Sequence, residues 1–210
     1  MASLNQIVYN IASLHGDPTD IELINRLKFQ VEYHRALLIR RDSAQVFNVP
    51  DQMTTTLRYE MELVDAVEGC DVALPCKFLR TTLPVPTPLN IKGAGGFFYV
   101  GAVDGQQGYQ YVTQESLLYA LTGKFSGGSP KFFYSGGYIY TVNSSAMCID
   151  VKMVVESPVT GGPGGGGVTC IDPDAEYPIT LDMIARVTQS ILATEFSAQR
   201  PPDDEQIEAE

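Results

Sequence analysis

The segment Asp17–Asp42, DPTDIELINRLKFQVEYHRALLIRRD, constrains the fold most, because no other stretch is as long without glycine or internal proline after its start. Asp17 is the expected N-cap, Pro18 suits the first helical position, and Asp20 stands where a capping box places its acid. The spacing predicts one helix about 38 Å long. Its main apolar stripe is Leu23, Ile24, Leu27, Val31, His34 and Leu38.

Further apolar side chains surround the rest of this predicted helix, namely Phe29, Tyr33, Leu37 and Ile39. So wide an apolar surface is hard to bury in one small core, so we expect part of it to contact another subunit. Bases gather near the C-terminal end, where the helix dipole favours cations. They form either a solvated helix end or an intersubunit or nucleic-acid-facing site. The candidate interface residues are Phe29, Tyr33, Arg35, Leu37, Arg40 and Arg41.

Composition excludes several classes of protein. The 210 residues carry a net charge of −11, which argues against tight binding to nucleic-acid phosphates. No apolar run approaches the roughly 20 residues of a membrane span, and no signal peptide opens the chain. We therefore expect no membrane partner and a protein that begins in a cytoplasm. Four cysteines in a chain of this length do not form a disulfide framework.

The remaining elements follow from periodicity and turn residues. A first helix is predicted over residues 3–15, capped by Ser3, and a last one over 180–197. The predicted apolar face of this last helix is Leu181, Ile184, Ala185, Thr188, Ile191, Leu192 and Phe196. Strands are predicted at 54–64, 77–82, 97–103, 109–112, 131–134, 138–142 and 148–156, with a hairpin at Gly136–Gly137 and a short helix over 115–121. The segment Leu83–Pro88 is extended but cannot lie inside a sheet.

These elements predict an α+β fold: an N-terminal αα-hairpin with one long helix, a central antiparallel β-sandwich or barrel, a C-terminal helix and a disordered acidic tail. The expected parts are a helical hairpin at 1–45 and a β-rich domain at 46–178 with a flexible glycine loop at 161–167. A helix at 179–197 then packs on the N-terminal helices, and a flexible tail occupies 198–210.

No pattern of catalytic, cofactor-binding or metal-binding residues is present. His15 lies at a turn and His34 on a helix stripe, and no nucleophile elbow or plausible triad partner accompanies the serines. Glu60 and Glu62 fit a solvated strand face better than a glycosidase pair. The cysteines, Cys70, Cys76, Cys148 and Cys170, lack zinc-knuckle spacing and are expected to be buried free thiols. Neither glycine-rich stretch, Gly93–Phe98 or Gly161–Gly167, fits a phosphate loop.

Three stretches in order along the chain resemble ring proteins from the neck and tail of crAss-like tailed phages. Arg26–Asp42 is similar to their N-terminal helix, Cys70–Lys92 resembles the Cys-containing, proline-punctuated strand pair that follows, and Cys170–Phe196 resembles their closing acidic turn and final helix. The glycine run at 161–167 is not part of that pattern. The likeness spans most of the chain.

The resemblance implies a non-enzymatic structural protein of the virion, a head-to-tail connector component. It implies a ring of identical subunits, with twelve expected, beneath the portal protein. Such a ring would extend the DNA channel without binding DNA specifically and would dock other neck or tail proteins. A further expectation is that the tail acids Asp203, Asp204 and Glu205 contact basic groups on an adjoining protein.

The alternative is a carbohydrate-binding module or an accessory enzyme built on the β-domain. Aromatic rings stack on sugars, and tyrosines are abundant in this region. The residues that would line such a site are Tyr99, Tyr109, Tyr111, Tyr134, Tyr138 and Tyr140. Tyrosines are equally expected at protein interfaces.

Overall fold

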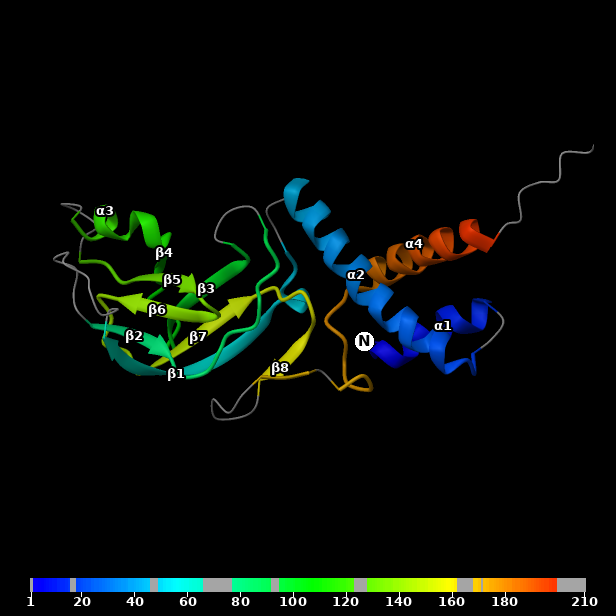
Figure 1. Cartoon of the computed structure of the whole chain (residues 1–210), viewed down its shortest axis with the longest axis horizontal. Helices are drawn as coiled ribbons and strands as arrows, with labels where there is room; N and C mark the ends of the chain where they lie inside the picture. The colour runs from blue at the N-terminus through cyan, green and yellow to red at the C-terminus, as the bar shows by residue number, and fades with distance from the viewer. Residues whose placement is uncertain are drawn as a thin grey trace, which may run out of the picture. The chain divides into compact units, whose positions relative to one another are not determined.

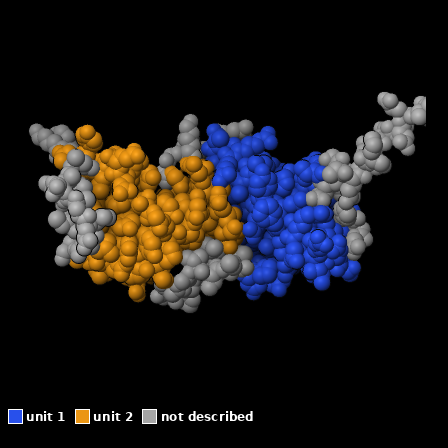
Figure 2. Space-filling model, in the orientation of Figure 1, with its two compact units in different colours: residues 1–45, 172–210 blue, residues 46–171 orange. Residues whose placement is uncertain are grey.

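The computed structural model describes residues 2–15, 18–45, 49–65, 77–91, 95–122, 128–161, 168–170 and 172–199. Within these residues the fold is α+β, as the sequence predicts. The chain divides into two compact units (Figure 2): unit 1 comprises residues 1–45 and 172–210, and unit 2 comprises residues 46–171.

Unit 1 is built from three helices: α1 (Leu4–His15), α2 (Ile21–Gln45) and α4 (Leu181–Gln199) (Figure 1). Ser3 caps α1 as predicted, because its Oγ accepts the Gln6 N–H while the Gln6 side chain accepts the Ser3 N–H. The helices pack through buried apolar side chains, among them Ile7, Val31 and Val187. The bridge between Ser3 and Glu176 joins the start of the chain to the segment that precedes α4.

The predicted start of α2 is wrong. The cap is Asp20, whose carboxylate accepts the N–H groups of Glu22 at 2.9 Å and Leu23 at 3.3 Å. Pro18 lies in the turn before the helix, and Asp17, the predicted cap, lies outside the described residues. An aspartate that caps with its own side chain cannot also be the acid of a capping box three residues later. The helix therefore begins at Ile21 and extends to Gln45.

The predicted core face of α4 is also wrong. The side chains of α4 that are buried are Met183, Val187 and Ile191. Of the predicted face, only Ile191 is buried, whereas Leu181 is 78 % exposed and Ala185 is exposed. The side chain of Phe196 and the whole of residues 200–210 lie outside the description. Apolar residues occur on two sides of this helix, so periodicity alone does not select the side that faces the core.

Unit 2 is a curved sheet whose strands are β1 (Thr55–Asp65), β2 (Lys77–Thr81), β3 (Phe97–Ala102), β4 (Gln110–Tyr111), β5 (Lys131–Ser135), β6 (Tyr138–Val142) and β7 (Cys148–Met153). Their order is β3-β7-β1-β2-β6-β5-β4 (Figure 1). All neighbouring pairs are antiparallel except β4 and β5, which are parallel, so the expectation of a wholly antiparallel sheet is wrong there. The hairpin at Gly136–Gly137 is confirmed, and both glycines have positive φ.

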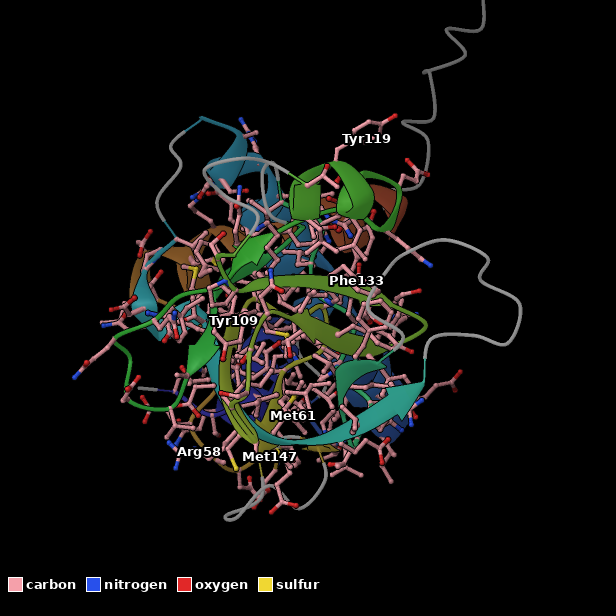
Figure 3. The ribbon with its side chains drawn as sticks, turned by 90° about the vertical axis from the view of Figure 1, so that its left-hand side faces the viewer. Arg58, Met61, Tyr109, Tyr119, Phe133 and Met147 are labelled. Carbon is pink, nitrogen blue, oxygen red and sulfur yellow. The ribbon has the colours of Figure 1, made fainter. Side chains whose placement is uncertain are left out.

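The sheet nearly closes into a barrel, which selects one of the two predicted architectures. Its two edges meet where Tyr109 donates its N–H to the Val100 carbonyl at 2.7 Å and Gly101 bridges Gly108. Gly101 is required at this seam, because a Cβ there would lie 2.2 Å from the Gln107 oxygen. Apolar side chains fill the interior, and Met61 lies on the inner side in Figure 3.

Short elements complete unit 2. The turn η2 (Gln114–Ser116) and α3 (Leu117–Thr122) cover a second apolar cluster on the outside of the sheet, around Phe78 and Phe133. Like η2, η1 (Asp51–Met53) is a short 3₁₀ helix, and it precedes β1. A small hairpin of β8 (Val159–Gly161) and β9 (Val168–Cys170) flanks the glycine run, and sequence reasoning missed it because each strand has three residues. Residues 162–167 between them lie outside the description.

Candidate functional site

An exposed apolar stripe runs along α2. Phe29, Tyr33 and Leu37 are 70 %, 55 % and 45 % exposed and follow one another at four-residue intervals. Helical geometry places them on one face, on the side away from the buried residues Leu27 and Val31. Single exposed apolar side chains are ordinary, but three in register on one helix form a continuous surface suited to protein contact.

Bases extend this stripe toward the C-terminal end of α2. Arg40 and Arg41 are both exposed. They give the surface a positive end beside the apolar side chains. An aromatic and aliphatic centre with arginine at its edge is the composition typical of protein interfaces.

Arg35 was predicted as an interface residue together with Arg40 and Arg41, but unlike them it is buried within unit 1. Its side chain is 0 % exposed inside unit 1. Its Nε donates to the Pro178 carbonyl at 2.9 Å, and its guanidinium carbon lies 5.8 Å from the centroid of the Tyr177 ring. Burial lowers the pKa of this guanidinium, while Tyr177 and Glu32 oppose that shift. Arg35 therefore supports the fold of unit 1 and is removed from the candidate interface.

The contacts between α2 and α4 within unit 1 are polar at two points. Arg186 donates to both oxygens of Asp42, at 2.6 Å and 3.0 Å, and this bond lowers the pKa of Asp42. The His34 Nδ1 lies 3.0 Å from the Ser190 Oγ, and burial lowers the pKa of His34. His34 is thus a partly buried packing residue. His15 ends α1, and its side chain is not described.

The outer face of the barrel carries three ion pairs, two of them between neighbouring strands. Arg58 on β1 bonds Asp150 on β7 at 2.8 Å, and Lys152 reaches Asp51 at 2.7 Å. Arg80 on β2 bonds Glu62 on β1. Glu62 and Glu60 therefore belong to a solvated face of alternating charge, as their alternation in the sequence predicts.

The six tyrosines of the carbohydrate hypothesis do not converge on one site. Tyr109 is buried in the barrel, where its hydroxyl lies 2.7 Å from the Ser144 Oγ, and Tyr111 and Tyr134 pack against the same interior cluster. Tyr99 donates its hydroxyl to the Ala102 carbonyl at the seam. The other two belong to β6 and lie on the outer face of the sheet: Tyr140 stacks on Phe133, and Tyr138 lies under the guanidinium of Arg80. No observation therefore favours the carbohydrate hypothesis.

One pocket of about 340 Å³ opens beside β1 at the end where Leu63 lies. Its lining is Leu63, Leu79, Thr141, Val142, Asn143, Ser144, Ser145 and Met147. Figure 3 shows Met147 close to Met61, and the Met61 N–H donates to the Met147 carbonyl at 2.8 Å. The lining contains no ionisable side chain and so has no group suited to acid–base catalysis.

The cysteines show one departure from expectation. Cys148 is a free thiol, but it is exposed rather than buried. Cys70 and Cys76 lie outside the described residues, and for Cys170 only the backbone in β9 is described. Among the side chains that the structure describes, no three of His, Cys, Asp or Glu could hold a metal ion. None of the described helices has both the length and the apolar character needed to cross a membrane.

Comparison with protein families decides the class of this chain. Residues 6–209 match the model of a family described as phage tail ring protein 2, from crAss-like phages. The chain belongs to this family. It is therefore a structural protein of a bacteriophage tail, and the resemblance seen in the sequence is confirmed. The family is a structural family and not an enzyme family. A comparison with curated proteins gave no match.

Proposed function

We propose that this ring protein assembles into a closed ring of twelve copies in the virion neck, directly below the portal protein. The ring extends the DNA channel and gives further neck or tail proteins a platform. The observation that carries the proposal is the exposed stripe on α2 in a chain of a ring family. A subunit that closes a ring must offer neighbouring copies an apolar surface, and this stripe is such a surface.

The proposed intersubunit contact consists of Phe29, Tyr33 and Leu37, with Arg40 and Arg41 at its edge. Complete burial of one such apolar side chain contributes about 1.5–3 kcal/mol. Three partly exposed side chains thus supply several kcal/mol per contact, before the cost of association is subtracted. This free energy holds an isolated pair of subunits together only weakly, but closure of a ring gives every subunit a second contact.

The charge of the chain supports a passive role toward DNA. The net charge is −11, and three bases on the outer face of the barrel are each bonded to an acid. A protein that retains DNA needs bases available to replace the counterions on phosphate. An acidic ring instead lets DNA pass without specific binding. Assembly in the host cytoplasm before incorporation into the virion is consistent with this role.

The acids Asp203, Asp204 and Glu205 are proposed to dock a neighbouring tail protein through its basic groups. They lie outside the described residues, so the proposal rests on their sequence alone. Deletion of residues 201–210 tests it. We expect weaker attachment of the next tail component, with a larger loss at low salt, where charge pairing is strongest. Normal attachment by the truncated chain would exclude docking through these acids.

The ring itself is tested with the variant Tyr33→Ser/Leu37→Ser. Sedimentation velocity and electron microscopy of the purified full chain, alone and on the portal protein, report the assembly. We expect rings for the wild-type chain and monomers for the variant. The control is Tyr119→Ser on α3, where a 79 % exposed tyrosine points outward in Figure 3.

We expect the control to assemble like the wild-type chain. A wild-type chain that stays monomeric in both settings contradicts the proposal as a whole. A variant that still forms rings contradicts the assignment of the α2 stripe. The count of subunits in averaged images tests the number twelve.

A further inference from the structure

The helix α4 has a second apolar side that the fold of unit 1 leaves partly exposed. Its core side is Met183, Val187 and Ile191. At 100° per residue, a different stripe passes through Leu181, Ala185, Thr188 and Leu192, more than a quarter-turn from the core side. Leu181 is 78 % exposed, Ala185 is exposed, and Leu192 is half-buried. A helix with apolar residues on opposite sides is typical of one that is covered on both.

Charge distinguishes this second face from the stripe on α2. Asp182 is exposed in the first turn of α4, and the preceding segment exposes Asp172, Asp174 and Glu176. Arg186, the one base in residues 172–194, is bonded to Asp42 of the same chain. The surroundings of the α4 face are therefore acidic, whereas the α2 stripe ends in Arg40 and Arg41. The two surfaces are complementary in charge and alike in apolar character.

The two faces do not cover each other within one subunit. The helices α2 and α4 pack together through His34 and Ser190 and through Asp42 and Arg186. Each apolar stripe lies on the side of its own helix that is turned away from the buried residues. A ring of more than two copies needs this arrangement, because every subunit must use one surface toward each neighbour.

We propose that the outward face of α4 receives the α2 stripe of the next copy in the ring. This inference rests on the proposed function and names the second half of its contact. The stripe from Phe29 to Leu37 is about 12 Å long and the face from Leu181 to Leu192 about 16 Å, so the lengths match. The helices run antiparallel across the contact, which sets Arg40 and Arg41 beside Asp182.

The test uses one variant for each face of the full chain. Tyr33→Ser/Leu37→Ser removes the α2 stripe. Ala185→Arg blocks the α4 face, because it adds bulk and a positive charge where the arginines of the neighbour would lie. Arginine is a good helix former, so the substitution leaves the helix itself intact. The matched control is Ala193→Arg, the same change on the same helix at an exposed position about 80° away around the axis.

Sedimentation velocity at a concentration where the wild-type chain forms rings gives the readout. We expect Ala185→Arg to weaken the contact at least about tenfold and to leave monomers, because the apolar burial is lost. We expect Ala193→Arg to form rings. An equal mixture of the α2 variant and the α4 variant should then form dimers and nothing larger, because only one intact pair of faces remains between them.

The outcomes separate this inference from the proposed function. Rings formed by Ala185→Arg while the α2 variant stays monomeric overturn the α4 assignment alone. A mixture that stays monomeric shows that the two faces do not meet, and a mixture that forms complete rings excludes a head-to-tail contact between them. Rings formed by the α2 variant overturn the proposed contact itself. If Ala185→Arg lowers the urea midpoint of the monomer, the substitution has damaged the fold, and Leu181→Ser replaces it in the single-variant and mixing experiments.

Discussion

Replacing the buried Arg35 tests whether this residue supports the fold or the assembly. Arg35→Met keeps an unbranched side chain of similar length and removes the guanidinium. The variant loses the hydrogen bond to the Pro178 carbonyl and the contact with the Tyr177 ring. It also leaves that carbonyl without this donor. The structure places all of these contacts inside unit 1, so the change acts on the stability of the monomer.

The magnitude follows from these contacts. A hydrogen bond from a charged donor contributes about 1.5–3 kcal/mol, and a desolvated cation–π contact about 2 kcal/mol. Removing the buried charge offsets part of the lost stabilisation, because burial disfavours the charged form of Arg35 and lowers its pKa. We expect Arg35→Met to reduce the free energy of unfolding by about 2 kcal/mol. Arg35→Glu should cost more than about 4 kcal/mol, because it buries an acid close to Glu32.

Urea denaturation followed by circular dichroism measures the effect at a concentration where the chain is monomeric. The control is Arg41→Met, an exposed position where the change should stay within about 0.5 kcal/mol. Equal midpoints for the two variants would refute the reasoning. So would an Arg35→Met chain that unfolds like the wild type but no longer assembles, since Arg35 would then act at an interface.

Three further predictions concern the seam, the interior and the pH dependence. Gly101→Ala should destabilise unit 2 by about 1–3 kcal/mol in urea, because its Cβ would clash with a backbone oxygen, whereas Gly108→Ala, with its nearest neighbour at 3.5 Å, should be tolerated. The hydroxyl of Tyr59 is buried without a hydrogen-bond partner, so Tyr59→Phe should leave stability at pH 7 unchanged or higher. Burial raises the pKa of Tyr59 in the folded state, so the neutral hydroxyl favours folding less and less as the pH rises above the unfolded pKa of about 10. In thermal melts at alkaline pH, Tyr59→Phe should therefore lose less stability than the wild-type chain. Asp42→Asn should reduce the free energy of unfolding by less than about 1 kcal/mol at pH 7, because the Asp42–Arg186 ion pair is partly exposed. The hydrogen bond from Arg186 lowers the pKa of Asp42, so the difference between variant and wild type should disappear in thermal melts as the pH falls below about 4.

Local pattern was enough to predict most of the helices and strands of this protein, although not the short hairpin of β8 and β9. The 3.6-residue period predicted the long helix, and Ser3 with Gln6 formed the expected cap. Alternation of apolar and polar residues predicted β1, and Gly136–Gly137 predicted the hairpin between β5 and β6. The class and the ring family were likewise accessible from sequence. Such features succeed because they depend on residues within a few positions of one another along the chain.

Tertiary structure alone decided which surfaces are inside. Both sides of α4 carry apolar residues, so its period is compatible with either side against the core, and the packing of unit 1 selected Met183, Val187 and Ile191. Arg35 resembles Arg40 and Arg41 in sequence but is buried, because Tyr177 and Pro178, more than 140 positions away, fold over it. Closure of the barrel likewise depends on Gly101 meeting Gly108. The contacts of Arg35 join segments distant in the chain, and the seam at Gly101 brings together the two edge strands of the sheet. Short-range periodicity carries no information about such partners.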